Sequence, residues 1–114
     1  MKVLWVDDLR QPPCEDYAWA KSVQEAKAYL AYHFSSDDYR IDIVDLDHDA
    51  GSFGGAAFGG DYINILKWLE WLQHEHGLPS DKIPAFCIHS QNPVGVANMR
   101  RIIERNNWVE MFSF

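Results

Sequence analysis

Residues 41–49 read Ile41-Asp42-Ile43-Val44-Asp45-Leu46-Asp47-His48-Asp49, and this stretch decides the fold. Its first part is a near-continuous apolar run, which is typical of a strand buried in the middle of a parallel sheet. Three carboxylates and an imidazole then follow within residues 45–49. In α/β proteins, ligands bind beyond the carboxyl ends of the strands. The stretch therefore predicts a central strand over residues 40–46 that leads into a functional site.

Two further apolar runs end in polar side chains of the same kind. Residues 3–6 lead into Asp7, and residues 86–88 lead into His89. Because parallel strands share a direction, the ends of these strands meet at one edge of the sheet. We therefore expect Asp7, Asp47 and His89 to come together at that edge.

Three segments with apolar residues at helical spacing predict helices between and after the strands. Ser22 and Glu25 form a capping box at the start of the first helix. Asp61 is the expected cap of the second helix, and Asn92 that of the third. Gly77 is the expected left-handed stop at the end of the second helix. Pro12-Pro13 excludes a helix interior between the first two strands. The predicted helices span residues 22–34, 61–76 and 92–105, and the predicted strands residues 2–6, 16–20, 40–46, 83–88 and 108–112.

The order of these elements predicts a parallel sheet with helices on its faces. A chain of 114 residues fits one domain, which we place over residues 1–114. No apolar run approaches the roughly 20 residues of a membrane span, and residues 1–4 do not look like a signal peptide, so we expect a cytoplasmic protein without a membrane partner. The net charge of -7 argues against strong non-specific binding of nucleic acid.

Three motifs resemble a known family. They read Trp5-Val6-Asp7-Asp8-Leu9-Arg10-Gln11-Pro12-Pro13, Leu46-Asp47-His48-Asp49 and His89-Ser90-Gln91-Asn92-Pro93-Val94-Gly95. They resemble the cyclic-phosphate processing receiver domains, and the resemblance covers nearly the whole chain. It implies a three-layer, receiver-like (flavodoxin-like) parallel α/β sheet of about five strands with helices on both faces, the first helix being replaced by the Pro-rich loop. It also implies activity on cyclic phosphate groups of nucleotides or RNA ends.

The chain is also similar to response-regulator receiver domains. On that resemblance Asp47 would be the phospho-acceptor, Asp7 and Asp8 the metal-binding acids, and Ser90 the hydroxyl residue. Three features depart from the receiver pattern: the Pro-Pro loop replaces the helix between the first two strands, no Lys follows residue 107, and two strand ends carry histidines. A signalling receiver phosphorylated on Asp47 therefore stays open as an alternative, as does a non-catalytic nucleotide-binding module.

The carboxylates at the strand ends predict a divalent metal. Clustered carboxylates repel one another, which raises at least one pKa unless a cation neutralises them. Oxygen ligands suit Mg²⁺ or Mn²⁺, and the neighbouring imidazoles leave Zn²⁺ and Fe²⁺ open. The predicted metal ligands are Asp7, Asp8, Asp47 and Asp49.

The remaining polar residues receive roles in phosphoester hydrolysis. A histidine titrates near neutral pH, so either imidazole can carry a proton, although a lone His at a strand end is more often structural. Arginine can hold a phosphoryl group through two hydrogen bonds. The predicted catalytic residues are Asp47, His48 and His89, and the predicted substrate-binding residues are Arg10, Ser90 and Asn92.

We therefore expect a metal-dependent phosphoesterase that acts on a nucleotide or an RNA end. Asp45, inside the central strand, has no predicted role. Residues 50–60 hold five of the seven glycines, and a phosphate cradle, a lid and a flexible loop all stay open for them. Trp68 and Trp71 lie off the main apolar stripe of their helix, where they either pack on the sheet or form a homodimer surface.

Overall fold

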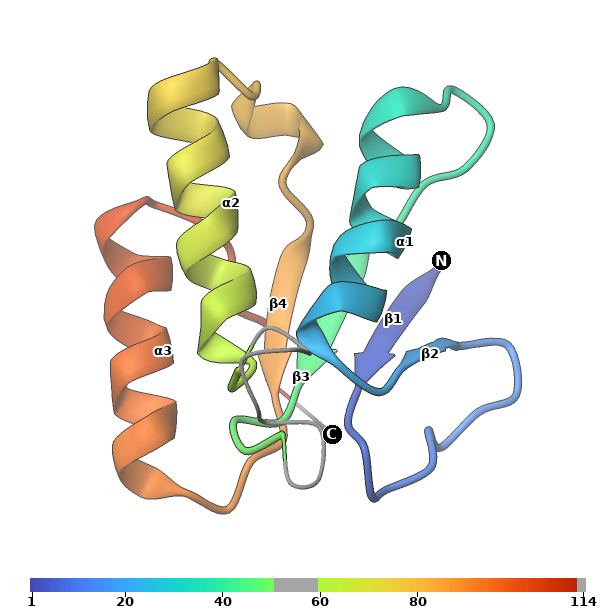
Figure 1. Cartoon of the computed structure of the whole chain (residues 1–114), viewed down its shortest axis with the longest axis vertical. Helices are drawn as coiled ribbons and strands as arrows, with labels where there is room; N and C mark the ends of the chain where they lie inside the picture. Colours follow the sequence, from blue (N-terminus) through green and yellow to red (C-terminus); the bar gives the residue numbers. More distant parts are fainter. Residues whose placement is uncertain (51–59, 113–114) are drawn as a thin grey trace.

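The computed structural model describes residues 1–50 and 60–112. Four parallel strands form one sheet with the order β2-β1-β3-β4. The strands are β1 (Val3–Val6), β2 (Ala18–Ala20), β3 (Ile43–Leu46) and β4 (Ala85–Ile88). The helices are α1 (Val23–Ser35), α2 (Ile63–His76) and α3 (Pro93–Arg105), with a short 3₁₀ turn, η3 (Ser80–Lys82), before β4 (Figure 1). No helix in this part of the chain is long and apolar enough to span a membrane.

The predicted parallel, receiver-like α/β sheet is confirmed, with four strands where about five were expected. The expected fifth strand, residues 108–112, forms an isolated parallel bridge between Phe86 and Glu110. The Phe86 N–H donates to the Val109 carbonyl at 2.8 Å, and the Phe86 carbonyl accepts from the Met111 N–H at 2.6 Å. The tail therefore occupies the place of a fifth strand beside β4 but pairs with it only around Phe86.

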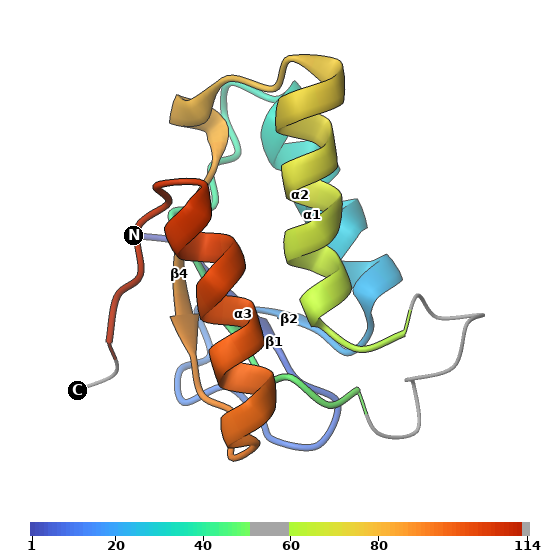
Figure 2. The same cartoon turned by 90° about the vertical axis from the view of Figure 1, so that its left-hand side faces the viewer.

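The described helices all lie on the same face of the sheet (Figure 2), whereas helices on both faces were expected. Strand-to-strand crossovers between parallel strands are right-handed in nearly all proteins. The connections through α1, α2 and α3 all step along the sheet in the same direction, so that these helices cover one face. Among the described connections, only that from β1 to β2 steps the other way. It is the predicted Pro-rich loop, so it places no helix on the second face.

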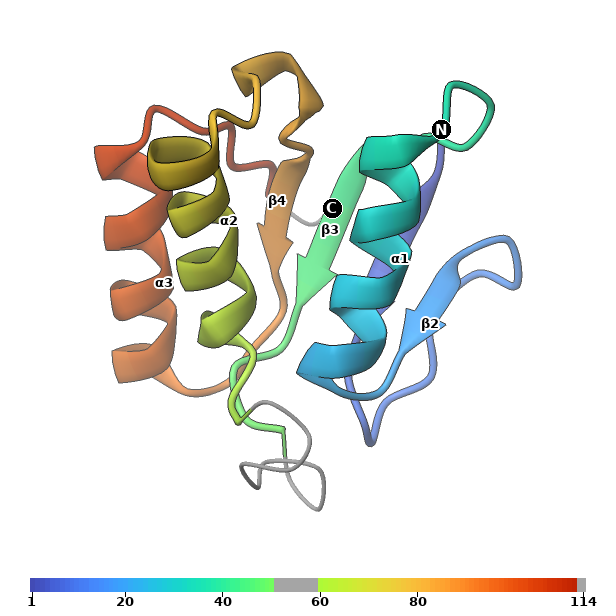
Figure 3. The ribbon, with the colours of Figure 1, turned by 45° about the horizontal axis from the view of Figure 1, so that its top comes forward.

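The core lies between the sheet and the three helices. Leu4 and Val6 of β1 and Phe86 of β4 point into it and are fully buried. Figure 3 shows α1 in front of the strands, with α2 and α3 side by side. Successive strand residues face opposite sides, so Trp5 and Asp45 point away from the helices. We call the side to which these two residues point the helix-free face.

Three of the predicted helix ends are confirmed. The Ser22 hydroxyl accepts the N–H of Glu25 at 3.1 Å at the start of α1, while the Glu25 carboxylate accepts the N–H of Lys21 at 3.1 Å rather than that of Ser22 as the capping box predicted. The Asn92 side chain accepts the N–H of Gly95 at 3.0 Å at the start of α3. Gly77 ends α2 with a φ of 69°, the left-handed conformation that glycine adopts without strain.

The predicted cap of α2 is wrong. The helix begins at Ile63, and its N-cap residue, Tyr62, makes no side-chain capping bond. Asp61 instead accepts the N–H of Ala50 at 3.2 Å. The Asp61 carboxylate thus ties the start of α2 to the segment that follows β3, rather than to the helix's own amides.

The two tryptophans of α2 lie in different surroundings. Trp68 is partly buried against the core, as the packing alternative predicted. Trp71 is half exposed and contacts His76 on the same helix. A homodimer through this helix stays a prediction.

Candidate functional site

The order of the strands reverses its direction between β1 and β3. In open α/β sheets, ligands bind at such a point, beyond the carboxyl ends of the strands. Asp7 follows β1 and Asp47 follows β3, and the Asp47 N–H donates to the Val6 carbonyl at 3.0 Å. The structure therefore brings these two acids to one end of the sheet, which we call the carboxyl edge.

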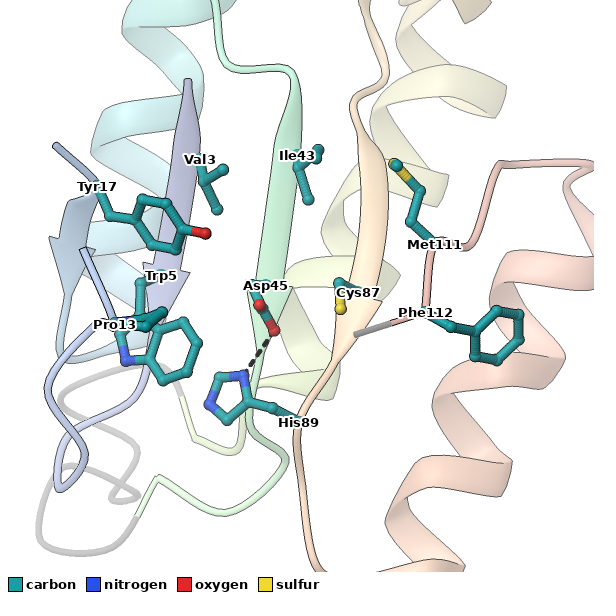
Figure 4. A pocket seen from close by; sticks show the side chains of 10 residues that line it. All are labelled: Val3, Trp5, Pro13, Tyr17, Ile43, Asp45, Cys87, His89, Met111 and Phe112. Carbon is teal, nitrogen blue, oxygen red and sulfur yellow. Dashed lines mark hydrogen bonds and ion pairs between the residues drawn. The ribbon is translucent and has the colours of Figure 1, made fainter. Parts of the chain in front are cut away.

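His89, which follows β4, is held between two carboxylates. Its Nε2 lies 2.9 Å from Oδ2 of Asp7, and its Nδ1 lies 2.7 Å from Oδ1 of Asp45 (Figure 4 shows the second contact). Its ring stacks on Trp5, with centroids 3.8 Å apart. Burial opposes protonation, but the hydrogen bonds and charges of Asp45 and Asp7 outweigh it, so the pKa of His89 is raised. The two carboxylates suit a doubly protonated ring, in which each nitrogen can donate to one of them.

Asp7 is fully buried behind the carboxyl edge. Its Oδ1 accepts the N–H groups of Leu9 at 2.9 Å and Arg10 at 3.0 Å, and its Oδ2 faces His89. The Trp19 indole donates to its carbonyl at 2.7 Å. Asp7 therefore shapes the turn after β1 and positions the imidazole. As a metal ligand it stays a prediction, and a metal there would share a carboxylate that already accepts hydrogen bonds on both oxygens.

Asp45 is a site residue that the sequence did not reveal. It lies on the helix-free face, and the sheet register places it opposite Cys87, two residues before His89. Its side chain is only 14% exposed. The alternation along β3 indicates which face Asp45 takes, but its partner depends on the pairing of β3 with β4, which the sequence does not state.

A second cluster lies where the chain leaves β3. Nδ1 of His48 is 2.7 Å from Oδ1 of Asp49. His48, Asp49 and Asp61 each offer a ligand atom, and these atoms all lie within 4.8 Å of one another. Within residues 1–50 and 60–112, this is the group whose spacing would fit a metal ion. The predicted ligands that lie outside this group are Asp7, Asp8 and Asp47.

Asp61 was expected to cap a helix, not to bind a metal. It lies eleven positions after Ala50, whose N–H it accepts. Because of that separation, no local sequence pattern indicates that Asp61 belongs to the cluster. Asp49 alone among the predicted ligands belongs to the cluster.

The ring of His48 packs directly against α3 at Gly95. A Cβ at position 95 would lie 2.6 Å from Cδ2 and 2.8 Å from Nδ1 of His48, closer than real contacts allow. Asn92, which caps the same helix, also donates to Asp49 at 3.4 Å. The first turn of α3 therefore fixes both members of the His48–Asp49 pair.

The three predicted substrate-binding residues differ in their surroundings. The Ser90 hydroxyl accepts the N–H of Asn92 at 3.1 Å and so shapes the turn before α3. Asn92 combines the helix cap with its contact to Asp49. Arg10 is exposed just after the acidic pair. Their roles in binding stay predictions, and most of the Gly-rich segment lies outside the described residues.

The negative charge at the carboxyl edge acts on a buried tyrosine. Tyr62 is fully buried, and its hydroxyl donates to the Lys21 carbonyl at 3.0 Å. Burial first, and then the charges of Asp8, Asp7 and Asp47, raise the pKa of Tyr62 well above its ordinary value. The three carboxylates thus act together on one place, as expected of acids gathered at the ends of neighbouring strands.

Comparison with curated proteins and with solved structures gave no match. The family model described as the cyclic-phosphate processing receiver domain matches residues 2–105. This span runs from the first strand to the last turn of α3 and includes both histidine–carboxylate clusters. The chain therefore belongs to the family of cyclic-phosphate processing receiver domains.

Proposed function

We propose that the chain is a metal-dependent phosphoesterase that processes a cyclic phosphate or phosphodiester on a nucleotide or an RNA end. The observation that carries this proposal is the pair of imidazole–carboxylate clusters at the carboxyl edge, His89 with Asp7 and Asp45, and His48 with Asp49. The family supports the cyclic phosphate as the substrate class.

His48 is the residue to which we assign proton transfer. Asp49 engages Nδ1 of the ring, and a carboxylate at that position fixes the tautomer and the orientation of the ring, which leaves Nε2 for proton exchange. Nε2 would take a proton from the attacking water and return it to the leaving oxygen. The packing of the ring on Gly95 holds it in one orientation.

His89 would act through its charge rather than through proton exchange. Both of its ring nitrogens already face carboxylates, and its side chain is only 10% exposed. In its protonated form, the ring would stabilise negative charge that develops on a phosphoryl group at the carboxyl edge. Asp47 would either hold the metal or attack phosphorus to form an aspartyl phosphate.

Two donor sets suit a divalent metal. His48, Asp49 and Asp61 provide nitrogen and oxygen donors, which suit Mn²⁺, Zn²⁺ or Fe²⁺. The predicted all-oxygen set favours Mg²⁺ or Mn²⁺. A bound metal would polarise a phosphoryl oxygen and lower the pKa of its water. His48 cannot bind the metal and carry the proton through the same nitrogen, so only one of the two sets can hold the metal in that case. The metal that supports turnover best therefore discriminates between the two sets. The predicted all-oxygen set is Asp7, Asp8, Asp47 and Asp49.

The test is incubation with cyclic nucleotides and with 2′,3′-cyclic phosphate ends in Mg²⁺, Mn²⁺ or Zn²⁺, followed by phosphorus NMR. We expect metal-dependent turnover that Asp47→Ala, His48→Ala and His89→Ala each lower by roughly 100-fold or more. The matched controls are Asp81→Ala and His76→Ala, both exposed and at the opposite end of the sheet, which should retain turnover. A folded protein that turns over none of these substrates with any metal would contradict the proposal.

A signalling receiver is the second candidate because Asp47 is partly buried at the carboxyl end of a central strand. Stable phosphate on Asp47 from a small phosphodonor, without hydrolysis of any substrate, would favour it. Nucleotide binding that survives chelation, again without turnover, would instead favour a non-catalytic binding module.

A further inference from the structure

The helix-free face of the sheet contains a cavity of about 260 Å³ (Figure 4). Trp5 and Tyr17 provide aromatic walls, the largely exposed Phe112 lies at the rim, and Asp45 and His89 provide the charged groups. The proposed chemistry uses His89 at the carboxyl edge but assigns nothing to the cavity itself.

The cavity exists because none of the helices within residues 1–50 and 60–112 covers this face. The loop between β1 and β2 contributes Pro13 from one side, and the tail beside β4 contributes Met111 from the other. The strands between them contribute Val3, Ile43 and Cys87, which all point away from the core. The result is an apolar hollow with a few polar groups at one end, the usual composition of a small-ligand site.

The size of the cavity limits its ligand. Sites for drug-sized molecules measure about 300–1,000 Å³. At about 260 Å³ the cavity takes a single ring system rather than a whole dinucleotide.

The charges select the chemistry of that ring system. Asp45 and Asp7 both face the imidazole of His89. Two carboxylates outnumber one imidazole, so this end of the cavity carries net negative charge whether or not the ring is a cation. That charge disfavours an anion and favours a hydrogen-bond donor. A carboxylate has about four lone-pair sites, and His89 uses one of those on Asp45. The hydroxyl of Tyr17 points toward the same space (Figure 4).

We propose that this cavity binds the nucleobase of the substrate, and that it prefers a base with an exocyclic amino group, such as adenine, guanine or cytosine. This assignment rests on the proposed phosphoesterase function. The aromatic walls would contact the base, and Asp45 would accept from its amino group.

His89 connects the cavity to the proposed phosphate site. Its Nδ1 contacts Asp45 in the cavity, and its Nε2 contacts Asp7 at the carboxyl edge. A nucleotide with its base in the cavity would therefore direct its sugar and phosphate past His89 toward Asp47. Uracil presents two carbonyl oxygens beside its single N–H, and these would face the Asp45 carboxylate unfavourably.

The experiment measures the binding of free nucleosides in the presence of EDTA, so that neither metal nor phosphate contributes. We expect adenosine, guanosine or cytidine to shift the NMR signals of the Trp5 indole and the Ile43 methyl groups, and to bind at least about 10-fold more tightly than uridine by calorimetry. Ile43→Phe fills the cavity and should weaken binding at least about 10-fold. Val94→Phe adds the same ring at an exposed position on α3 and is the matched control.

A second variant, Tyr17→Phe, removes only a hydroxyl from the cavity and guards against misfolding of Ile43→Phe. It should weaken binding while leaving the spectrum of the free protein largely unchanged. Nucleoside binding in the cavity without any turnover of cyclic phosphates would support the cavity and count against the phosphoesterase. Turnover of cyclic phosphates without nucleoside binding would overturn the cavity assignment alone. Nucleoside-induced shifts confined to residues outside the cavity, or equal affinity for uridine, would overturn it as well.

Discussion

Gly95 shows how one residue without a side chain shapes the candidate site. The ring of His48 lies where a Cβ at position 95 would be, and the N–H of Gly95 is used by the cap of α3. The position carries no positive φ, so the backbone itself does not require glycine there. The close approach of the imidazole is therefore the physical reason for this glycine.

Gly95→Ala should destabilise the protein and lower its turnover. Alanine in a helix is favoured over glycine by about 1 kcal/mol, but the clash with the His48 ring would cost about 1–3 kcal/mol. In a His48→Ala background the clash disappears, and the same change should stabilise by roughly 0.5–1 kcal/mol. Urea unfolding of the unmutated protein, the two single variants and the double variant measures how far the effect of Gly95→Ala differs between the two backgrounds. Equal effects of Gly95→Ala in both backgrounds would show that the ring does not pack on this position.

At this scale the sequence reveals a residue when its role follows from its own position in an element. Asp7, Asp47 and His89 end apolar runs, so their arrival at one edge was predictable. Asp45 and Asp61 act through partners whose proximity depends on strand register and on a loop. No local pattern encodes those distances, which is why both residues were missed.

At the scale of the elements, α2 and α3 are joined by a set of hydrogen bonds at the far end of α3. Nε of Arg105 donates to Glu70 Oε2 at 2.7 Å, and Nη2 donates to Oε1 at 2.6 Å. The Asn106 side chain also donates to Glu70. The Arg105 hydrogen bonds, with those of Asn106, outweigh desolvation and hold the pKa of Glu70 below its ordinary value of 4.5.

This pKa shift predicts a pH-dependent contribution to stability. A carboxyl group whose pKa is lower in the folded state stabilises that state above its unfolded pKa, and the gain is lost as the pH falls through the folded pKa. Glu70→Gln should therefore lower the Tm at neutral pH by roughly 2 °C, a small change because the Arg105 side chain is more than half exposed and water screens the pair. The difference from the unmutated protein should vanish in acid. Glu75→Gln, an exposed change on the same helix, should leave the Tm unaltered at every pH. A difference at neutral pH that persists in acid would exclude the ionised Glu70 as its cause.

The elements themselves were largely predictable because their signals are local. The caps at Ser22 and Asn92 and the stop at Gly77 each depend on residues within one turn. The start of α2 was not predictable, because the carboxylate of Asp61 is used by Ala50. The predicted last strand, residues 108–112, forms only a bridge around Phe86. This pairing depends on the path of the tail beside β4 rather than on strand propensity.

At the scale of the whole molecule, the strand order determines which face the described helices leave uncovered. The sequence identifies the elements and the Pro-rich loop, but the step from β1 to β2 runs opposite to the others only because of the order β2-β1-β3-β4. Right-handed crossovers then place the described helices together. The same topology leaves the face that carries Asp45 to be covered by a loop and by the tail.

The tail should therefore contribute to stability like an element of the fold. Trp108 packs on the core and donates to Gln73 at 2.9 Å, and the residues after it supply both backbone partners of Phe86. Ending the chain after Asn107 removes the partly buried Trp108 side chain and two backbone hydrogen bonds. The free energy of unfolding should fall by about 3–5 kcal/mol. Such a loss is large against the roughly 5–15 kcal/mol of a typical domain.

Urea unfolding and amide hydrogen exchange test this prediction together. The shortened chain should unfold at a lower urea concentration, and the Phe86 amide should exchange faster because β4 becomes an open edge. Amides of β1, in the interior of the sheet, should keep their rank when the amides of the protein are ordered by their protection from exchange. Val109→Ala, an exposed change that leaves the backbone intact, should alter stability by no more than about 0.5 kcal/mol. Unchanged stability after the truncation would mean that the helix-free face does not need the tail, and that the wall of the cavity nearest β4 is dispensable to the fold.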